Sequence, residues 1–145
     1  MSLEILESVR KVFGGSEPTE EERLKLKQEV MLMVLARATA ADTNISGIEV
    51  DTVREIILER IGVELTTAEV RVAANSDIFE KEPLPRFVAS ARKQLTPAEC
   101  EDIMEALAQV ISVDEVIGGR ELAFYDQIAD ALQMPRAADA GISTT

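Results

Sequence analysis

The sequence contains no histidine and no tryptophan, and Cys100 is the only cysteine among its 145 residues. Without histidine, the commonest general base and the usual protein ligand of zinc, copper and non-haem iron are both missing. A single cysteine excludes an intramolecular disulfide and any zinc site built from several thiolates. Any metal bound by this chain is therefore expected to be a hard cation held by oxygen atoms. Cys100 is expected to be a buried structural thiol, because no histidine is present to activate it.

Aromatic residues are also scarce, and the charge is strongly one-sided. Four Phe and one Tyr leave a core of Leu, Ile, Val, Ala and Met, which favours helices. Fifteen Lys and Arg against 27 Asp and Glu give a formal net charge of −12, which repels phosphate backbones and anionic lipid headgroups. We therefore expect no nucleic-acid partner. Cations and basic protein surfaces suit this charge, although the sequence identifies no particular protein partner and no oligomeric state.

Long hydrophobic runs are absent as well. The amino terminus, MSLEILESVRKVF, has no apolar core of the length found in signal peptides. No segment reaches the roughly 20 apolar residues that span a bilayer. The sequence therefore predicts a cytoplasmic protein that does not insert into a membrane, and its length predicts a single domain over residues 1–145.

Apolar spacing and helix-capping signals predict an all-α fold of about seven helices. The expected helices cover approximately residues 3–13, 20–41, 47–61, 67–79, 86–94, 97–113 and 119–134. Four begin at a capping box, in which Ser or Thr precedes Glu by three residues: Thr19–Glu22, Ser46–Glu49, Thr66–Glu69 and Thr96–Glu99. The second helix is apolar around much of its circumference, which predicts a central position, and the short connections predict mostly antiparallel packing of successive helices in a bundle. A polar tail over residues 136–145 is expected to have little secondary structure.

An internal repeat becomes visible when the chain is shifted by 72 residues. The segments LARATAADTNISGIEVDTVREII and LAQVISVDEVIGGRELAFYDQIA are identical at seven of 23 positions, and each predicts a helix, a short turn and a helix. The turns share the pattern D-x-x-I-x-x-x-E, formed by Asp42, Ile45 and Glu49 in the first copy and by Asp114, Ile117 and Glu121 in the second. This repeat predicts a bundle with internal pseudo-two-fold symmetry.

The first turn begins like an EF-hand calcium loop but does not continue as one. Asp42 occupies the first position of such a loop, and Gly47 occupies the sixth, where a turn-forming glycine belongs. The twelfth position, which should hold a bidentate glutamate, is Val53 in this copy and Tyr125 in the other. Neither turn is therefore an EF-hand. The glycines shared by the two copies, Gly47 and Gly119, are expected to permit tight backbone geometry.

Two interpretations of the four repeated acids remain open from the residues alone. Glu49 and Glu121 stand at the third helical position, where a carboxylate caps free backbone N–H groups, and Asp42 and Asp114 can hydrogen-bond the turn backbone. Alternatively, the four acids bind calcium, magnesium or manganese, either in one shared site or in one water-rich site per turn. An aspartate at the carboxyl end of a helix meets an unfavourable dipole, which a cation would offset. We expect no carboxylate-based enzyme, since acid and base roles require two separated pKa values.

The acidic turns resemble those of the TerB-like family, which includes the tellurite-resistance TerB proteins and a domain attached to some membrane-anchored J-domain proteins. The family signature A-x-x-D-G-x-I-x-x-x-E is similar to AADTNISGIE, residues 40–49, and more weakly to SVDEVIGGRE, residues 112–121. The family's glycine after the aspartate is replaced by Thr43 in one turn and by Glu115 in the other. The resemblance covers roughly residues 20–135 and implies an all-helical bundle with internal two-fold pseudo-symmetry.

The same resemblance implies a function for the acidic turns. It assigns metal-chelating roles to Asp42, Glu49, Asp114 and Glu121, and it links the protein to tellurite and stress response without an established enzymatic reaction. No His-Pro-Asp signature of a J-domain is present, so the chain is expected to be the TerB-like module alone. The alternative function is that of a purely structural or protein-interaction bundle whose acidic residues are helix caps.

Overall fold

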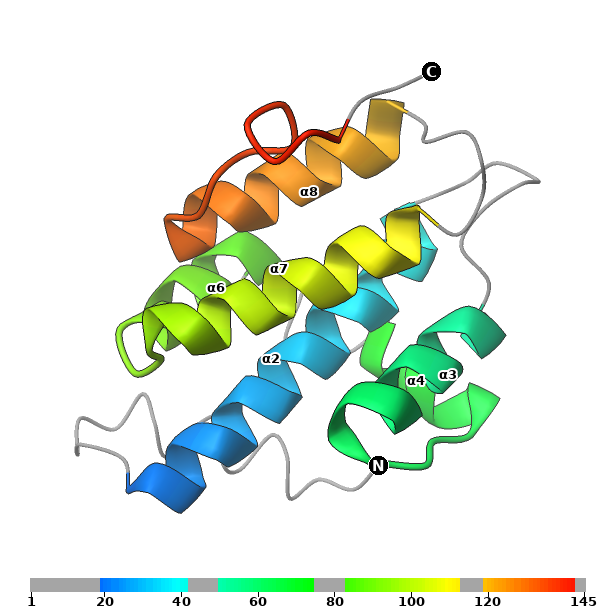
Figure 1. Cartoon of the computed structure of the whole chain (residues 1–145). Helices are drawn as coiled ribbons and strands as arrows, with labels where there is room; N and C mark the ends of the chain where they lie inside the picture. Colours follow the sequence, from blue (N-terminus) through cyan, green and yellow to red (C-terminus); the bar gives the residue numbers. More distant parts are fainter. Residues whose placement is uncertain (1–18, 42–49, 75–82, 113–118, 143–145) are drawn as a thin grey trace.

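The computed structural model describes residues 19–41, 50–74, 83–112 and 119–142. Within these ranges the chain forms six α-helices and no strand (Figure 1), which confirms the all-α class. The helices are α2 (Glu20–Ala41), α3 (Val50–Ile61), α4 (Thr67–Ala74), α6 (Leu84–Arg92), α7 (Pro97–Ile111) and α8 (Gly119–Leu132). The structure describes six of the roughly seven helices predicted from the sequence. The remaining predicted helix, over residues 3–13, lies outside the described residues. The predicted continuation of the fourth helix beyond Ala74 lies outside them too.

Three helices begin at the capping boxes that the sequence predicts. In the boxes at the beginning of α2, α4 and α7, the Thr hydroxyl accepts the Glu backbone N–H at 3.1–3.2 Å, and the Glu carboxylate accepts the Thr backbone N–H at 2.8–3.2 Å. Helix α6 differs, since it starts two residues earlier than predicted, after Pro83 and without a side-chain cap. Helix α3 ends as predicted at Gly62, whose φ of +69° is a left-handed conformation that favours glycine.

Removing the cap of α7 is expected to destabilise the whole domain by a modest amount. Thr96→Ala deletes the hydroxyl that accepts the Glu99 backbone N–H, which should lower the free energy of unfolding by about 1 kcal/mol. Urea unfolding followed by circular dichroism measures this difference. Thr96→Ser keeps the hydroxyl and should recover most of the loss, whereas equal stability of Thr96→Ala and the unmodified chain would contradict the capping role.

Helix α2 is the centre of the bundle, as its wide apolar surface predicts. It contacts α3, α4, α6, α7 and α8. Its buried residues point in all directions around the helix, and several of them have no exposed surface: Val30, Val34, Leu35 and Ala36. A helix that is apolar all round can only be stable when other helices cover it on every side. Each of the other five described helices therefore packs directly against α2.

Helices α2 and α7 do not follow each other in the chain, and they pack in parallel, whereas the antiparallel packing predicted from the sequence concerns successive helices. Two ion pairs join them: Arg23 Nε lies 3.2 Å from Glu99 Oε1, and Lys27 Nζ lies 2.7 Å from Asp102 Oδ2. The partners advance in the same direction along both helices, which only parallel helices allow. Figure 1 shows both helices running from the same end of the bundle. The two predicted helix–turn–helix units thus pack side by side with their first helices parallel.

The carboxyl-terminal residues return along α8 without forming a helix (Figure 1). Asp126 accepts the backbone N–H of Ala137 at 2.8 Å, and Arg136 donates two hydrogen bonds to Asp130 at 2.9 and 2.6 Å. The hydrogen bond from Arg136 lowers the pKa of the Asp130 carboxyl. Ala137 is buried against the core, so this part of the tail is ordered by tertiary contacts rather than by its own secondary structure.

Candidate functional site

Only one of the four predicted metal ligands falls within the described residues. Glu121 is the third residue of α8 and is half-buried in its first turn. Asp42, Glu49 and Asp114 lie outside the described residues, so a shared site formed by all four carboxylates stays a prediction. The structure does describe the helix ends that flank both acidic turns, and these ends decide where the turns start and finish.

The carboxyl ends of α2 and α7 lie at the same end of the bundle. Beyond the contact between Lys27 and Asp102, α2 continues for 14 residues to Ala41 and α7 for nine residues to Ile111. At a rise of about 1.5 Å per residue these lengths are about 21 and 14 Å, so the two parallel helices end within roughly two turns of each other. Asp42 directly follows the first of these ends, and Asp114 follows the second by three residues.

The amino ends of α3 and α8 point to the same end of the bundle. Near the end of α3, Arg60 donates a hydrogen bond to Gln109 of α7 at 2.9 Å and lies 3.9 Å from Glu105. Because α3 runs antiparallel to α7 (Figure 1), its first residue, Val50, lies toward the carboxyl end of α7. Helix α8 also begins at this end, and α3 and α8 each contact both α2 and α7. Both acidic turns therefore connect helix ends on one side of the molecule.

The helix dipoles at this end of the bundle oppose one another, because the carboxyl ends of α2 and α7 and the amino ends of α3 and α8 lie on the same side. The carboxyl end of each helix carries a partial negative charge of roughly half an elementary charge. Neither α2 nor α7 has a basic residue in its last turn, whereas α3, α4 and α6 each end with an arginine there. Helix α8 also lacks one, but it ends on the opposite side of the bundle. The carboxyl ends of α2 and α7 therefore have no basic residue in the last turn to offset their partial negative charge, and the partial positive charge at this side comes from the amino ends of α3 and α8.

One part of the turn prediction is wrong. Gly119 was expected to permit tight backbone geometry, yet it is the first residue of α8, its φ is not positive, and a Cβ built on it would meet no atom within 4 Å. Neither the conformation nor the space around this residue requires glycine. The identity of Gly47 and Gly119 between the two repeats therefore does not indicate a shared tight turn at the second position; Gly47 itself lies outside the described residues.

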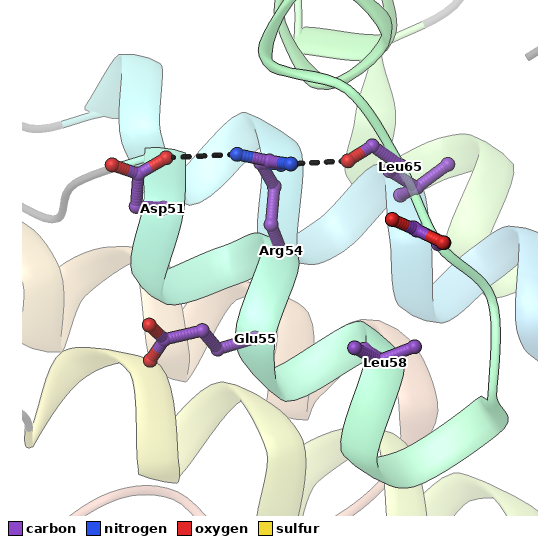
Figure 2. Close-up of a pocket in the computed structure, with 6 residues that line it drawn as sticks. Asp51, Arg54, Glu55, Leu58 and Leu65 are labelled. Atoms are coloured by element: carbon purple, nitrogen blue, oxygen red, sulfur yellow. Dashed lines mark hydrogen bonds and ion pairs between the residues drawn. The ribbon is translucent and has the colours of Figure 1, made fainter.

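An acidic cleft lies along α3, the helix that follows the first acidic turn in the sequence (Figure 2). It lies between α3 and the connection to α4 and is lined by Asp51, Arg54, Glu55, Leu58, Glu64 and Leu65. Arg54 crosses it, donating hydrogen bonds to the Leu65 carbonyl oxygen at 2.6 Å and to the Asp51 carboxylate at 3.1 Å. Asp51 is only two residues beyond Glu49, but its charge is already matched by the guanidinium. We therefore do not count it as a further ligand.

Sequence analysis did not predict the bond between Arg54 and Leu65. The pair of Asp51 and Arg54 is visible in the sequence as an i, i+3 ion pair, but nothing local indicates a bond that spans eleven residues. Over the part of the chain that the structure describes, no group of three or more Asp, Glu or Cys side chains is arranged to hold a metal ion. No helix there is both long and apolar enough to cross a bilayer.

Cys100 has the buried environment predicted for a structural thiol. It is 2 % exposed on the core side of α7, and burial raises the pKa of its thiol, which disfavours the reactive thiolate. We expect Ellman's reagent to modify Cys100 much more slowly in the folded chain than in the chain unfolded by guanidinium. Reaction of the folded chain at the rate of the unfolded one would indicate an accessible, activated thiol and contradict this role.

Comparison with known families gives one match, which covers most of the chain. A family model described as "Tellurite resistance protein TerB" matches residues 28–142, which is most of the chain. The chain belongs to the TerB family. The TerB match contains both acidic turns and all four predicted ligands, and it includes the tail up to residue 142. It begins within α2, so the first 27 residues lie outside the part matched to TerB. No curated protein and no solved structure matches the chain.

Proposed function

We propose that this TerB protein is a non-enzymatic cytoplasmic module that binds one divalent cation between its two acidic turns and acts in the response to tellurite or a related stress. The family name, tellurite resistance protein TerB, supports the cellular role. A single cysteine suits a reducing compartment such as the cytoplasm. Occupancy of the cation site would set the shape that the acidic end of the bundle offers to a partner.

The parallel packing of α2 and α7 is the observation that carries this proposal. In an antiparallel arrangement the two helices would end on opposite sides of the bundle, and the two aspartates could not share a ligand. The ion pairs between them are consistent only with both carboxyl ends lying on one side, where neither helix has a basic residue in its last turn. A bound cation would offset the carboxylates that follow these two helix ends.

The chemistry of the four side chains selects the kind of cation. Asp42, Glu49, Asp114 and Glu121 together offer up to eight carboxylate oxygens, and the chain has no histidine and no accessible thiol. Calcium takes six to eight oxygen ligands, and magnesium and manganese take about six with some contributed by water. Two carboxylates from a single turn supply too few for either, which favours one site shared by both turns.

Thermal unfolding of the full chain with the Glu121→Gln variant tests this function. Millimolar calcium, magnesium or manganese should raise the melting temperature of the unmodified chain above its value in chelator, because a ligand stabilises only the state that it binds. Glu121→Gln should reduce this rise, whereas Glu105→Gln, on exposed α7 surface, should leave it unchanged. A melting temperature that is indifferent to all three cations would contradict the function.

The alternative, that the acids are helix caps in an interaction module, is favoured by one specific observation. Three glutamates at the third helical position of α2, α4 and α7 do form capping boxes in this structure. Glutamine also serves in a capping box, so under this alternative Glu121→Gln should change the stability little. Neither the unmodified chain nor the variant should then change its melting temperature when cations are added. The same melting experiment therefore separates the two functions.

A further inference from the structure

Two adjacent hollows lie around α3 and the connection that follows it. One is the acidic cleft of Figure 2, with a volume of about 260 Å³. The other, of about 170 Å³, lies between the first half of α2, the second half of α3 and the same connection, and is called the apolar hollow below. Leu65 lines both of them, so one elongated ligand can occupy the two together.

The apolar hollow selects for size and hydrophobicity. Its wall contains five branched aliphatic residues: Leu32, Ile57, Ile61, Val63 and Leu65. A cavity of about 150 Å³ accommodates a benzene ring, so this hollow has room for one large apolar side chain. Lys25 and Glu29 also line it, one of each charge sign, so the hollow carries no formal net charge.

The acidic cleft selects for positive charge. Asp51, Glu55 and Glu64 share it with a single guanidinium, that of Arg54, which leaves a net charge of −2. Arg54 is already held by the Asp51 carboxylate and the Leu65 carbonyl oxygen. Glu55 and Glu64 are exposed, and within the described part of the chain neither of them makes a hydrogen bond or an ion pair. An incoming cationic group can therefore pair with either carboxylate without breaking an existing contact.

The carboxylates are spread along the cleft rather than gathered around one point. Over the residues that the structure describes, no group of three or more acidic or thiol side chains is arranged to hold a metal ion. Asp51, Glu55 and Leu58 follow the i, i+4, i+7 spacing of one helix face and cover about 10 Å along α3. Leu58 is 51 % exposed, so a large apolar side chain lies beside the acids. This pattern fits an elongated ligand with several positive charges and apolar groups.

We propose that the apolar hollow and the acidic cleft together bind a basic amphipathic segment of a partner protein. One apolar side chain of the segment fills the hollow, a second packs on Leu58, and lysine or arginine side chains pair with Glu55 and Glu64. Amphipathic helices are recognised in this way through anchors spaced three or four residues apart. Charge complementarity selects this occupant, because a second copy of the chain would add a net charge of −12, and nucleic acid or anionic lipid would be repelled.

Fluorescence anisotropy with a labelled model peptide tests this site in the full-length chain. The probe is a helical peptide of about twelve residues with leucine at every third or fourth position and lysine at the others. It should bind at physiological salt, and the same peptide with serine in place of leucine should bind at least about tenfold more weakly. Chelator is present throughout, so the result does not depend on the proposed cation site.

A pair of charge variants locates the lysine contacts. Glu55→Gln combined with Glu64→Gln removes two charges from the cleft and should weaken binding of the leucine–lysine peptide by about tenfold. The matched control is Glu59→Gln combined with Glu101→Gln, which changes the net charge of the chain equally at exposed residues outside both hollows. This control should weaken binding by less than about twofold, because salt screens distant charges.

A second pair of variants locates the apolar contact. Val63→Trp fills the apolar hollow without changing the charge and should weaken binding by about tenfold. Val72→Trp, at a residue of α4 that is 66 % exposed and outside both hollows, should leave it unchanged. Leu58→Ser provides an independent variant if Val63→Trp fails to fold, because Leu58 is already half-exposed and contributes little to the core.

Three results would overturn the proposal. The first is an absence of binding at up to about 1 mM peptide. The second is equal binding of the serine-containing peptide, which would show attraction by charge alone. The third is an affinity that the cleft pair of glutamate variants lowers no more than the control pair, or that survives both Val63→Trp and Leu58→Ser in folded protein.

Discussion

Replacing Leu107 with alanine is expected to lower the free energy of unfolding by roughly 2–5 kcal/mol, the largest stability effect among the substitutions considered. Leu107 has no exposed surface and belongs to α7, which contacts α2, α3 and α8. Truncation removes buried apolar atoms and leaves a cavity that tightly packed helices fill only in part. A domain of this size is typically stable by only about 5–15 kcal/mol, so the variant would be marginal at elevated temperature.

Urea unfolding at 25 °C measures this loss against two matched variants. Leu35→Ala changes the residue at the equivalent position of the first repeat, which also has no exposed surface, and should cost a similar amount. Leu58→Ala removes the same atoms from a side chain that is 51 % exposed and should cost much less. If Leu107→Ala cost no more than Leu58→Ala, the placement of α7 in the core would be wrong.

The second large effect is expected from neutralising the aspartate of either turn. In chelator, Asp42→Asn and Asp114→Asn should raise the melting temperature, because each removes one of the four negative charges that the proposed shared site brings together. Two carboxylates about 4 Å apart repel each other by about 4 kcal/mol at an effective dielectric constant near 20, which exceeds the ~1 kcal/mol of a typical cap. The metal-free protein should therefore gain stability when this charge is removed.

The same variants should lose the response to cations. A cation present at a hundred times its dissociation constant stabilises the folded state by about 2.7 kcal/mol, and removal of one ligand should abolish most of this gain. Asp130→Asn is the matched control, since its carboxylate pairs with Arg136 near the other end of α8. Melting in chelator and in millimolar cation measures both effects. Variants that are less stable in chelator and as responsive as the unmodified chain would refute the metal interpretation.

The parts of the fold that depend on neighbouring residues could be predicted from the sequence. Capping boxes fix the starts of α2, α4 and α7 because their hydrogen bonds join residues only three positions apart. The central position of α2 follows from its apolar circumference, since such a helix must be covered on all sides. The end of α3 at Gly62 follows from the left-handed conformation that glycine favours.

Contacts between distant residues could not be predicted in the same way. The parallel direction of α2 and α7 is visible in ion pairs between residues about 75 positions apart, and many surface charges could have formed such pairs. Glu99 illustrates the difficulty, because it both caps α7 and pairs with Arg23 of α2, and only the first role is visible in the sequence. The burial of Glu29, which is only 2 % exposed, was likewise not predicted, because a charged residue is ordinarily expected at the surface.

The candidate site is predictable to the extent that a repeat identifies equivalent residues. The shift of 72 residues selects two aspartates and two glutamates, and the structure adds that the helices flanking both turns end on one side of the bundle. It also shows that identity alone is no guide to role, since Gly119 recurs without any conformational need for glycine. Whether four carboxylates converge depends on the paths of both turns, which the repeat pattern does not specify.

Counting the cations bound per chain tests the central claim most directly. Isothermal titration of the full-length, chelator-treated protein with calcium, magnesium and manganese gives the number of sites and their affinity in one measurement. A site shared by both acidic turns predicts one cation per chain for at least one of these metals, and loss of that site in either Asp42→Asn or Asp114→Asn. Two independent sites per chain, each lost in only one variant, or no binding of any of the three metals, would contradict it.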